Sequence, residues 1–362
     1  MITEIVTHFR PHADELVALM LLRNFPEGEE KFPGVSTAKI SFLFTGSLPE
    51  GKSAYDFPEK IFLGVGGGMF DEHATDNKER VEDETCLTLV AKYLGLDKDI
   101  NLERIIYFVK QDDLQGSKVK DGLSVMIKFL HSCYKDDVEK IYKWVETAYL
   151  AEYKKDKSFL ESIKDLPNFE DLFNEFKNKW QAPTYSSSTL CLEEQGYKDL
   201  NEWKSFMEKA LKYQDDQYKD AVKKFDTEAK KETFIAKDGK PLTMAVITSD
   251  NEEMNKASRT RVTDVTIIFN SRGNVGIFTY HKRMIDLTKV FILLRMAEQY
   301  YRGEIKIKDE KELSKEGMVE NIPWYLIASR NAGYNGSLTT KDIEPTKIPK
   351  EKIIELVKEG LK

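Results

Sequence analysis

Two histidines and an aspartate lie close together near the start of the chain. His8, His12 and Asp14 stand at offsets of 0, +4 and +6, directly after a short apolar run. Neutral imidazoles and carboxylates together suit a divalent transition ion such as Mn, Fe or Zn. The spacing therefore predicts a metal site. The alternative is that His12 and Asp14 only cap a helix, a task that Asp performs well.

A second group of candidate ligands follows a run of glycines. The apolar residues 61–63 lead into glycines at 66–68 and then into Asp71, Glu72 and His73. The glycines allow a close backbone approach to a ligand, but they lack the Lys-Ser/Thr of a phosphate-binding loop and the spacing of a dinucleotide fingerprint. Three of the chain's five histidines fall in these two stretches. We therefore expect both stretches to share one metal site.

The third candidate group is an acidic pair at the end of an apolar segment. Asp112 and Asp113 follow the apolar residues of segment 104–116, which ends in Gly116. Taken alone, such a pair is a common end of a helix or strand. The two preceding stretches are what make it a candidate for the same site.

The elements expected around these residues are those of an α/β domain. Residues 2–6 are typical of a short strand, Pro11 prevents a helix across the two histidines, and residues 16–22 open a helix. Residues 84–94 predict a buried helix that ends at Gly95. In an open α/β sheet the ligand crevice lies at the carboxyl ends of the strands. The candidate ligands follow strands and would meet there.

Three segments resemble the metal-binding blocks of the melanocyte proliferating gene protein family. They are residues 7–19 (Thr-His-Phe-Arg-Pro-His-Ala-Asp-Glu-Leu-Val-Ala-Leu), residues 65–73 (Val-Gly-Gly-Gly-Met-Phe-Asp-Glu-His) and residues 111–116 (Gln-Asp-Asp-Leu-Gln-Gly). That family is similar to the DHH (Asp-His-His) phosphoesterase superfamily, which includes RecJ-type exonucleases and manganese pyrophosphatases. Residues 243–280 also resemble the family's second domain, whereas the resemblance does not extend to residues 135–230.

The resemblance implies a set of metal ligands and a cofactor. His8 and His12 would bind one ion and Asp14 a second, with Mn as the first choice and Mg, Zn or Fe as alternatives. The full implied set of metal ligands is His8, His12, Asp14, Asp71, His73, Asp112 and Asp113.

The chain departs from the family pattern at two positions. Glu72 stands where the motif has its middle histidine, and Gly64 stands where the family has a bridging Asp. Because that acid is absent, the sequence leaves open whether the site holds one ion or two. Asp71 is a candidate for the bridging role. One ion still lowers the pKa of a bound water, and Glu72 or Asp113 would serve as the catalytic base.

These residues predict a metal-dependent hydrolase acting on phosphoesters. Two ions about 3.5–4 Å apart activate water and hold both oxygens of an in-line phosphoryl displacement. By resemblance we expect a nuclease or nucleotide phosphodiesterase, with single-stranded RNA or DNA as a candidate substrate. The alternatives are a catalytically degenerate module that binds a nucleotide or nucleic acid, and a single-metal hydrolase of a non-phosphate substrate. A metalloprotease is excluded because His8 and His12 enclose no glutamate.

Composition and length suggest a two-domain cytoplasmic protein. The 362 residues are 41% hydrophobic, and the net charge of −7 argues against a protein that coats nucleic acid by bulk electrostatics. Three widely spaced cysteines make a disulfide framework unexpected. No apolar run approaches the roughly 18 residues of a membrane span, and the first residues lack the basic region of a signal peptide.

We expect three regions along the chain. Residues 1–134 would form a DHH-like parallel-sheet domain, residues 135–231 a helical linker or insertion broken at 181–189, and residues 232–362 a smaller α/β substrate-binding domain. Basic side chains of the last region, Arg295 among them, are candidates for holding phosphate. Segment 329–338 predicts a loop that would form an anion nest. The expected substrate-binding residues are Arg272, Arg330, Asn335, Gly336 and Ser337.

Overall fold

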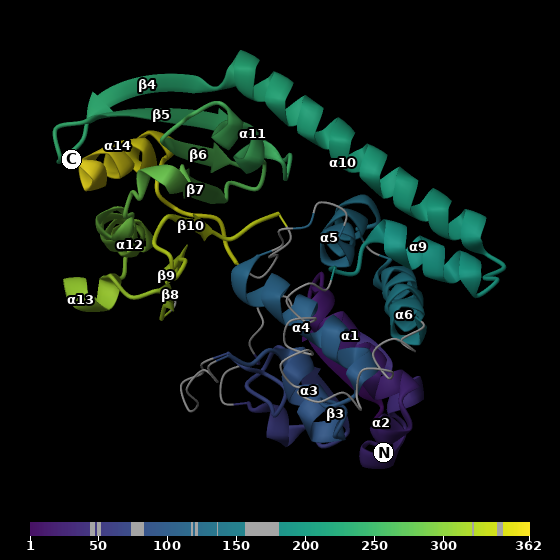
Figure 1. Ribbon diagram of the computed structural model, residues 1–362. Helices are drawn as coiled ribbons and strands as arrows, with labels where there is room; N and C mark the ends of the chain where they lie inside the picture. The colour runs from purple at the N-terminus through teal and green to yellow at the C-terminus, as the bar shows by residue number, and fades with distance from the viewer. Residues whose placement is uncertain are drawn as a thin grey trace, which may run out of the picture. The chain divides into compact units, whose positions relative to one another are not determined.

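The predicted α/β class with two domains is confirmed by the computed structural model (Figure 1). The chain divides into two compact units, Met1–Gln214 and Asp215–Lys362. The structure describes residues 1–43, 48, 52–73, 83–116, 119, 122–135, 137–155, 181–320, 322–338 and 343–362.

The first unit is built on a parallel sheet of three strands in the order β2-β1-β3. These strands are β1 (Glu4–His8), β2 (Lys39–Leu43) and β3 (Lys60–Leu63). Thr7 of β1 lies opposite Leu63 of β3, so His8 and Gly64 are the next residues along the two paired segments. The sheet thus brings the predicted ligand His8 and the glycine that follows β3 to the same edge.

Helices surround this sheet. They are α1 (Ala13–Asn24), α2 (Pro26–Lys31), α3 (Cys86–Leu94), α4 (Ile100–Gln115), α5 (Leu123–Cys133), α6 (Val138–Lys154), α9 (Tyr185–Glu194) and the first part of α10 (Leu200–Glu228), with 3-10 turns at Val35–Thr37 and Ala54–Asp56. The predicted helix at 84–94 is α3, and Gly95 ends it with a positive φ of 78°.

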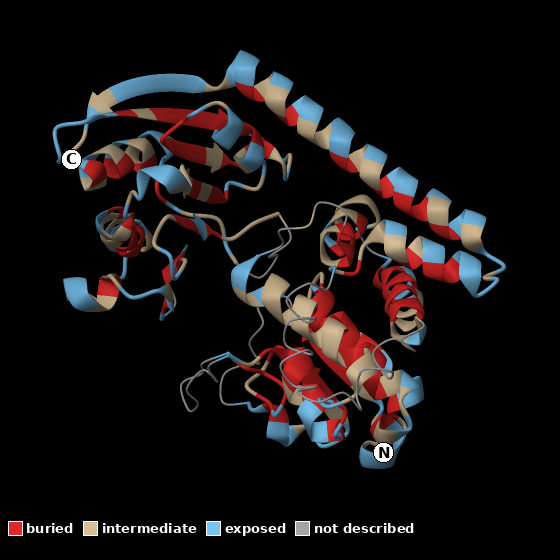
Figure 2. Ribbon diagram, in the orientation of Figure 1, coloured by how far each residue is buried: buried red, intermediate tan, exposed pale blue. Residues whose placement is uncertain are grey.

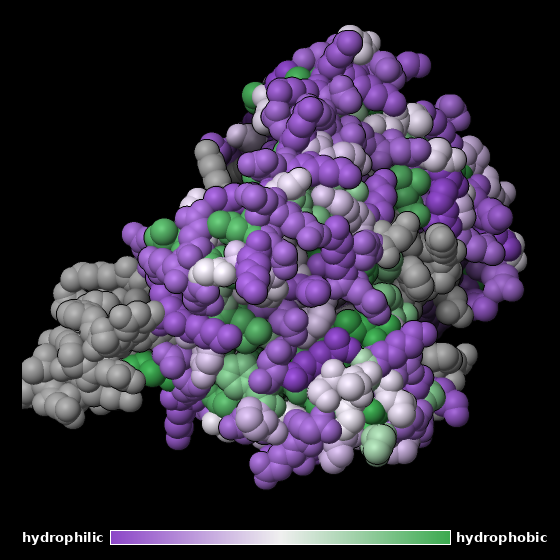
Figure 3. Space-filling view, turned by 90° about the vertical axis from the view of Figure 1, so that its right-hand side faces the viewer, coloured by the Kyte–Doolittle hydropathy of each residue, from purple (hydrophilic) through white to green (hydrophobic). Residues whose placement is uncertain are grey.

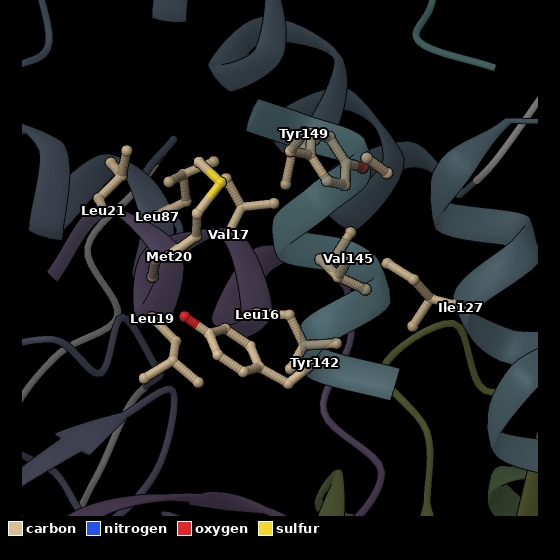
Figure 4. Packing of buried hydrophobic residues seen from close by; sticks show 14 of the residues in the cluster. Leu16, Val17, Leu19, Met20, Leu21, Leu87, Ile127, Tyr142, Val145 and Tyr149 are labelled. Atoms are coloured by element: carbon tan, nitrogen blue, oxygen red, sulfur yellow. The ribbon is translucent and has the colours of Figure 1, made fainter. Parts of the chain in front are cut away.

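The central element of the first unit is α1. Every residue from Ala13 to Leu22 is buried (Figure 2), which is the pattern of a helix enclosed on all sides. Leu16, Val17 and Met20 lie among side chains of α3, α5 and α6 (Figure 4). Because α1 cannot shift within this core, its first turn is a rigid support for the residues that begin it.

The helices of the middle segment belong to the first unit. The sequence placed residues 135–231 in a linker or insertion, whereas α6, α9 and the first part of α10 contribute buried residues to the same core as α1. The boundary between the units falls inside α10, at Gln214 and Asp215. Part of that segment, at 156–180, lies outside the described residues. Apolar residues of the first part of α10 pack in the core of the first unit, and those of its last part pack in a core of the second unit (Figure 2).

The interruption expected at 181–189 is shorter than predicted. Helix α9 starts at Tyr185, so the serines at 186–188 lie inside it. Thr184 caps this helix because its Oγ1 accepts a hydrogen bond from Ser187 N at 3.0 Å. Serine is tolerated in a first helical turn once a threonine satisfies the exposed N–H groups.

The second unit contains a mixed sheet of seven strands in the order β4-β5-β6-β7-β10-β9-β8. The strands are β4 (Lys230–Ile235), β5 (Pro241–Thr248), β6 (Val265–Phe269), β7 (Val275–Thr279), β8 (Gly317–Val319), β9 (Ile322–Leu326) and β10 (Ala332–Asn335). The helices are α11 (Met254–Thr260), α12 (Thr288–Arg302), α13 (Glu310–Leu313) and α14 (Lys350–Leu361), with a 3-10 turn at His281–Arg283. One face packs against α12 and α14, while the end of α10 and α11 pack on β5 and β6 from the other side.

The segment predicted as a loop at 329–338 contains a strand. β10 pairs with both β7 and β9. A Cβ at Gly333 would come within 2.1 Å of Phe291 Cζ, so glycine is needed for packing rather than for a flexible loop. A short strand rich in small residues carries little periodic signal, and only its two neighbours reveal it.

The buried hydrophobic residues form cores internal to each unit. The face drawn in Figure 3 is mostly hydrophilic, in agreement with a sequence that is 32% charged. Over the residues that the structure describes, no helix combines the length and the apolar character needed to cross a membrane.

Candidate metal centre

The turn between β1 and α1 carries the first group of ligands. His8 ends β1, and His12 is the N-cap residue of α1. Arg10 between them has a positive φ of 59°, a conformation that non-glycine residues adopt only when surrounding contacts enforce it. One such contact is the hydrogen bond at 2.8 Å that His131 Nε2 of α5 donates to Pro11 O. The turn is therefore held from outside.

His8 is oriented by both of its ring nitrogens. Nδ1 lies 3.0 Å from Phe9 O and donates to it, and Nε2 lies 3.0 Å from Glu15 Oε1. Burial opposes protonation, but the Glu15 carboxylate outweighs it and raises the pKa of His8 to about 9. The backbone carbonyl on Nδ1 holds the ring orientation, and a metal bound at Nε2 would displace the proton shared with Glu15.

Glu15 joins the two histidines. Its Oε2 accepts a hydrogen bond from His12 N at 2.8 Å, and the ring centroids of His8 and His12 are 4.8 Å apart. Burial would raise the pKa of Glu15, yet the neighbouring His8 lowers it to about 2. The protein packed around the exposed His12 ring reduces its hydration, and this lowers the pKa of His12. A neutral His12 and an ionised Glu15 are the forms that bind a divalent ion.

Asp14 has a capping role, but not on the helix that the sequence suggested. Its Oδ2 accepts from Cys86 N at 2.8 Å and its Oδ1 from Leu87 N at 3.0 Å, at the start of α3. Asp14 therefore caps α3, a different helix from the one that contains it. Burial and the Glu15 charge raise the pKa of Asp14. An ionised carboxylate has about four lone-pair positions, so capping leaves acceptor capacity for an ion.

The second predicted group forms a compact acid–histidine cluster. Asp71 Oδ2 accepts from Gly67 N at 2.7 Å, and Asp71 Oδ1 lies 3.0 Å from His73 Nδ1. Burial would raise the pKa of Asp71, but hydrogen bonds from His73 and Gly67 lower it. Such a carboxylate–histidine pair is the arrangement that orients metal-binding histidines. The glycine turn thus serves to aim Asp71.

Glu72 is the most unusual group of the cluster. Its side chain is 3% exposed and its Oε1 lies 3.4 Å from His73 Nδ1, but Oε2 accepts no hydrogen bond from any residue that the structure describes. Burial, opposed by His73, raises the pKa of Glu72. A buried carboxylate oxygen with no donor is costly unless a cation or water satisfies it.

Of the two late acids, Asp113 rather than Asp112 reaches the cluster. Both lie in the last turns of α4, where consecutive side chains point about 100° apart. Asp113 groups with Asp14 and Glu72, while Asp112 lines a separate pocket with Ser124 and Tyr149. Acids near a helix C-terminus are electrostatically unfavourable, so their presence there indicates a role other than helix stability.

Six of the predicted ligands, together with the predicted base Glu72 and the unpredicted Glu15, form three groups, each with ligand atoms within 4.8 Å of one another. These groups are His8, His12 and Glu15; Asp71, Glu72 and His73; and Asp14, Glu72 and Asp113. Imidazole nitrogens with carboxylate oxygens suit Mn, Fe or Zn, and the unsatisfied oxygen of Glu72 fits a cation that would balance the buried acids. The residues present therefore fit a divalent metal.

Two residues of this region escaped the sequence analysis. Glu15 stands at the third position of α1, where a glutamate commonly bonds back to the helix N-cap, and this position was its only sequence signal. His131 lies far from the other histidines in the chain, and no local pattern connects it with Pro11. Its burial lowers its pKa to about 4, so it acts as a neutral donor that positions the turn.

The predicted substrate-binding residues lie in the second unit. Arg272 Nη1 donates to Ser337 O at 3.0 Å, so these two residues adjoin. Arg330 Nη1 donates to Thr288 Oγ1 at 2.9 Å. Asn335 is wholly buried and donates to Pro323 O at 2.5 Å, and Gly336 has a positive φ of 63°. Asn335 thus serves to hold the end of β10.

Arg295 does not hold phosphate, contrary to the sequence-based expectation. It is fully buried, and its guanidinium donates to four carbonyl oxygens, those of Leu313, Lys315, Gly317 and Trp324. The five N–H donors of an arginine suit this task, which ties α12 to α13, β8 and β9. A buried arginine is indistinguishable from a surface arginine in one sequence.

Comparisons with known proteins leave the family of the chain open. No protein-family model matches it, and no curated protein matches it. The solved structure of an uncharacterized protein from Helicobacter pylori G27 aligns with 100% of this chain and 99% of its own, at 10% identity and a TM-score of 0.25. A likeness at that TM-score carries no argument about fold or function.

Proposed function

We propose that this chain is a metal-dependent phosphoesterase, acting as a nuclease or nucleotide phosphodiesterase with Mn²⁺. The observation that carries the proposal is that the segment 8–15, from the end of β1 into α1, groups His8 and His12 with Glu15, while its Asp14 groups with Glu72 and Asp113 from two other segments. The resemblance of residues 7–19, 65–73 and 111–116 to DHH phosphoesterases points to the same chemistry. No feature of composition alone would suggest it.

The residues have two roles, metal binding and proton transfer. His8, His12, Glu15, Asp14, Asp71, His73 and Asp113 would hold the metal. When bound, the metal supplies a lowered pKa for its water and polarises the phosphoryl oxygens. Glu72 is the candidate general base, because burial raises its pKa and one of its oxygens lacks a donor within the described chain. A base with a raised pKa accepts a proton more readily near neutral pH.

The second-unit residues Arg272 and Arg330 are proposed as phosphate contacts. Arg272 Nη1 donates to Ser337 O and Arg330 Nη1 to Thr288 Oγ1, and Arg330 Nε lies 3.5 Å from Glu316 Oε1. Planar guanidinium groups match phosphate geometry.

One observation favours a second candidate, a non-catalytic metal- or nucleotide-binding module. Both oxygens of Asp14 accept hydrogen bonds from the backbone of α3, so this carboxylate has a structural task that does not require chemistry. Gly64 and Glu72 also replace residues of the catalytic pattern. Such a module would bind metal without hydrolysing phosphoesters.

The test combines metal content with a cleavage assay. Protein purified without chelator is analysed for bound metals, and labelled single-stranded RNA and DNA are incubated with it and Mn²⁺. We expect bound metal and cleavage, and we expect His12→Ala to lower the cleavage rate about 100-fold or more without unfolding the chain, because His12 is exposed. The matched control is Lys98→Ala, an exposed substitution in the same unit.

Each outcome separates the candidates. Metal without cleavage of either nucleic acid favours the binding module or a non-phosphate substrate. Absence of both metal binding and cleavage rejects the metal centre altogether. Equal activity of His12→Ala and Lys98→Ala would remove His12 from the site.

A further inference from the structure

Gly64 and Glu15 compete for the same space. Gly64 follows β3 with a positive φ of 64°, and a Cβ built on it would lie 2.9 Å from Glu15 Oε1 and 3.2 Å from Glu15 Cγ. The distance of 2.9 Å is shorter than real Cβ atoms show, the distance of 3.2 Å is tight, and the positive φ adds strain for any side chain. A side chain at position 64 and Glu15 in its present rotamer therefore exclude each other.

The Glu15 carboxylate lies at the junction of the site. It contacts His8 Nε2 through one oxygen and His12 N through the other, and the residue is only 5% exposed. The same carboxylate lies against Gly64, whose N–H donates to Phe70 O at 2.9 Å, one residue before Asp71. Glu15 thus groups with His8 and His12, which we call the histidine side, and lies next to the acidic side formed by Asp71, Glu72 and Asp113.

An independent observation on Glu72 indicates where a cation would bind. Glu72 is 2% exposed, and its Oε2 has no hydrogen-bond partner among the described residues. Buried carboxylates near one another repel, and proteins keep such groups only when a cation or a shared proton compensates them. Carboxylate oxygens of Asp14, Glu72 and Asp113 lie within 4.8 Å of one another, so a cation held by Asp14 and Asp113 would lie close to the Glu72 carboxylate.

We propose that Glu15 supplies the carboxylate shared by the histidine side and the acidic side of the metal centre, and that position 64 is glycine because Glu15 fills the space of its side chain. The shared acid would then come from the first turn of α1 instead of from the end of β3. This inference rests on the metal site of the proposed function and does not depend on the reaction.

The experiment measures Mn²⁺ binding in the full chain, by paramagnetic resonance of free Mn²⁺ and by equilibrium dialysis. The variants are Glu15→Gln, Gly64→Asp and the exchange variant that combines Glu15→Ala with Gly64→Asp. Glutamine keeps the acceptor for His12 N but loses the charge, and Asp tolerates a positive φ better than most residues. Glu30→Gln, at an exposed position of the same unit, is the matched control.

We expect Glu15→Gln to weaken Mn²⁺ binding about 100-fold or more, and Glu30→Gln to leave it unchanged. Gly64→Asp alone should weaken binding because it displaces Glu15. The exchange variant should bind within about tenfold of wild type, since the carboxylate returns from the other side of the same space. Circular dichroism of each variant checks that it is folded.

The possible results have separate meanings. Wild-type affinity in Glu15→Gln overturns this inference and leaves the proposed function standing, whereas a wild-type chain that binds no Mn²⁺ overturns both. If Glu15→Gln loses binding but the exchange variant does not regain it, the competition for position 64 is rejected. If Glu15→Gln fails to fold, the exchange variant alone decides, and its binding or lack of binding supports or overturns the inference.

Discussion

At the scale of single residues, the candidate centre depends on side chains that hold other side chains. His131 donates to Pro11 O, and the predicted ligand His8 donates from Nδ1 to Phe9 O. Such supports fix rotamers and tautomers before a metal arrives, so the ligands lose little conformational freedom on binding. The positive φ of Arg10 shows that the turn is held in a conformation it would otherwise avoid.

His131 gives a prediction about stability and pH. Its pKa is lowered by burial to about 4 in the folded chain, against about 6.5 in an unfolded chain. The neutral ring favours folding, so this contribution is present above about pH 6.5 and is lost as the pH falls towards about 4, by roughly 3 kcal/mol in total. Urea unfolding at pH 7 and pH 5 measures it.

The control is His131→Gln, which keeps an N–H donor for Pro11 O but does not titrate. We expect wild type to lose about 2 kcal/mol more than this variant between pH 7 and pH 5. Equal losses in the two proteins would show that His131 is not neutral when folded.

At the scale of elements, α1 is the support of the whole first unit. Its residues from Ala13 to Leu22 are buried, and its first turn carries Asp14 and Glu15 while the preceding residue is His12. Asp14 ties this turn to the start of α3 through two hydrogen bonds. A helix packed on all sides is a more exact scaffold for ligands than a surface loop.

The packing of α1 predicts the cost of a cavity. Leu16 is 1% exposed and lies inside the core (Figure 4), so Leu16→Ala should lower the free energy of unfolding by about 2–5 kcal/mol. Leu190 on α9 is 52% exposed, and Leu190→Ala should change it by less than about 0.5 kcal/mol. Urea denaturation of both full-length variants compares the two. Similar values would contradict the buried position of α1.

At the scale of the whole molecule, two compact units carry separate cores. The core around α1 belongs to Met1–Gln214, and the cores around the seven-stranded sheet belong to Asp215–Lys362. All three candidate ligand groups lie in the first unit. The second unit supplies no ligand to these groups, so metal binding and the stability of the second unit should be separable.

Calorimetry of the full chain tests this separation. We expect two unfolding transitions, and Mn²⁺ at about 100 times its dissociation constant should stabilise one of them by about 2.7 kcal/mol. The transition that moves should be that of the first unit, and His12→Ala should abolish the shift. A shift of both transitions by the same amount, or a shift that persists in His12→Ala, would contradict the location of the metal centre.

The sequence by itself determined the local elements and most of the ligand set. Apolar periodicity, Pro11 and Gly95 placed β1, α1 and α3 correctly, because these signals act within one or two turns of chain. The sequence predicted His8 and His12 on a strand-to-helix turn, and the structure has His8 as the last residue of β1 and His12 as the N-cap of α1. The acid–histidine run at 71–73 was also visible as a candidate ligand group.

Only the tertiary structure decided which groups meet. Asp113 and not Asp112 groups with the other acids because of the rotation of α4. Asp14 bonds to the N-terminus of α3, and Glu15 lies against Gly64. The tertiary structure also buried Arg295 and Asn335, which the sequence had placed among phosphate contacts. Each of these outcomes depends on the packing of segments that are far apart in the chain, and neither helical nor strand periodicity carries information about such contacts.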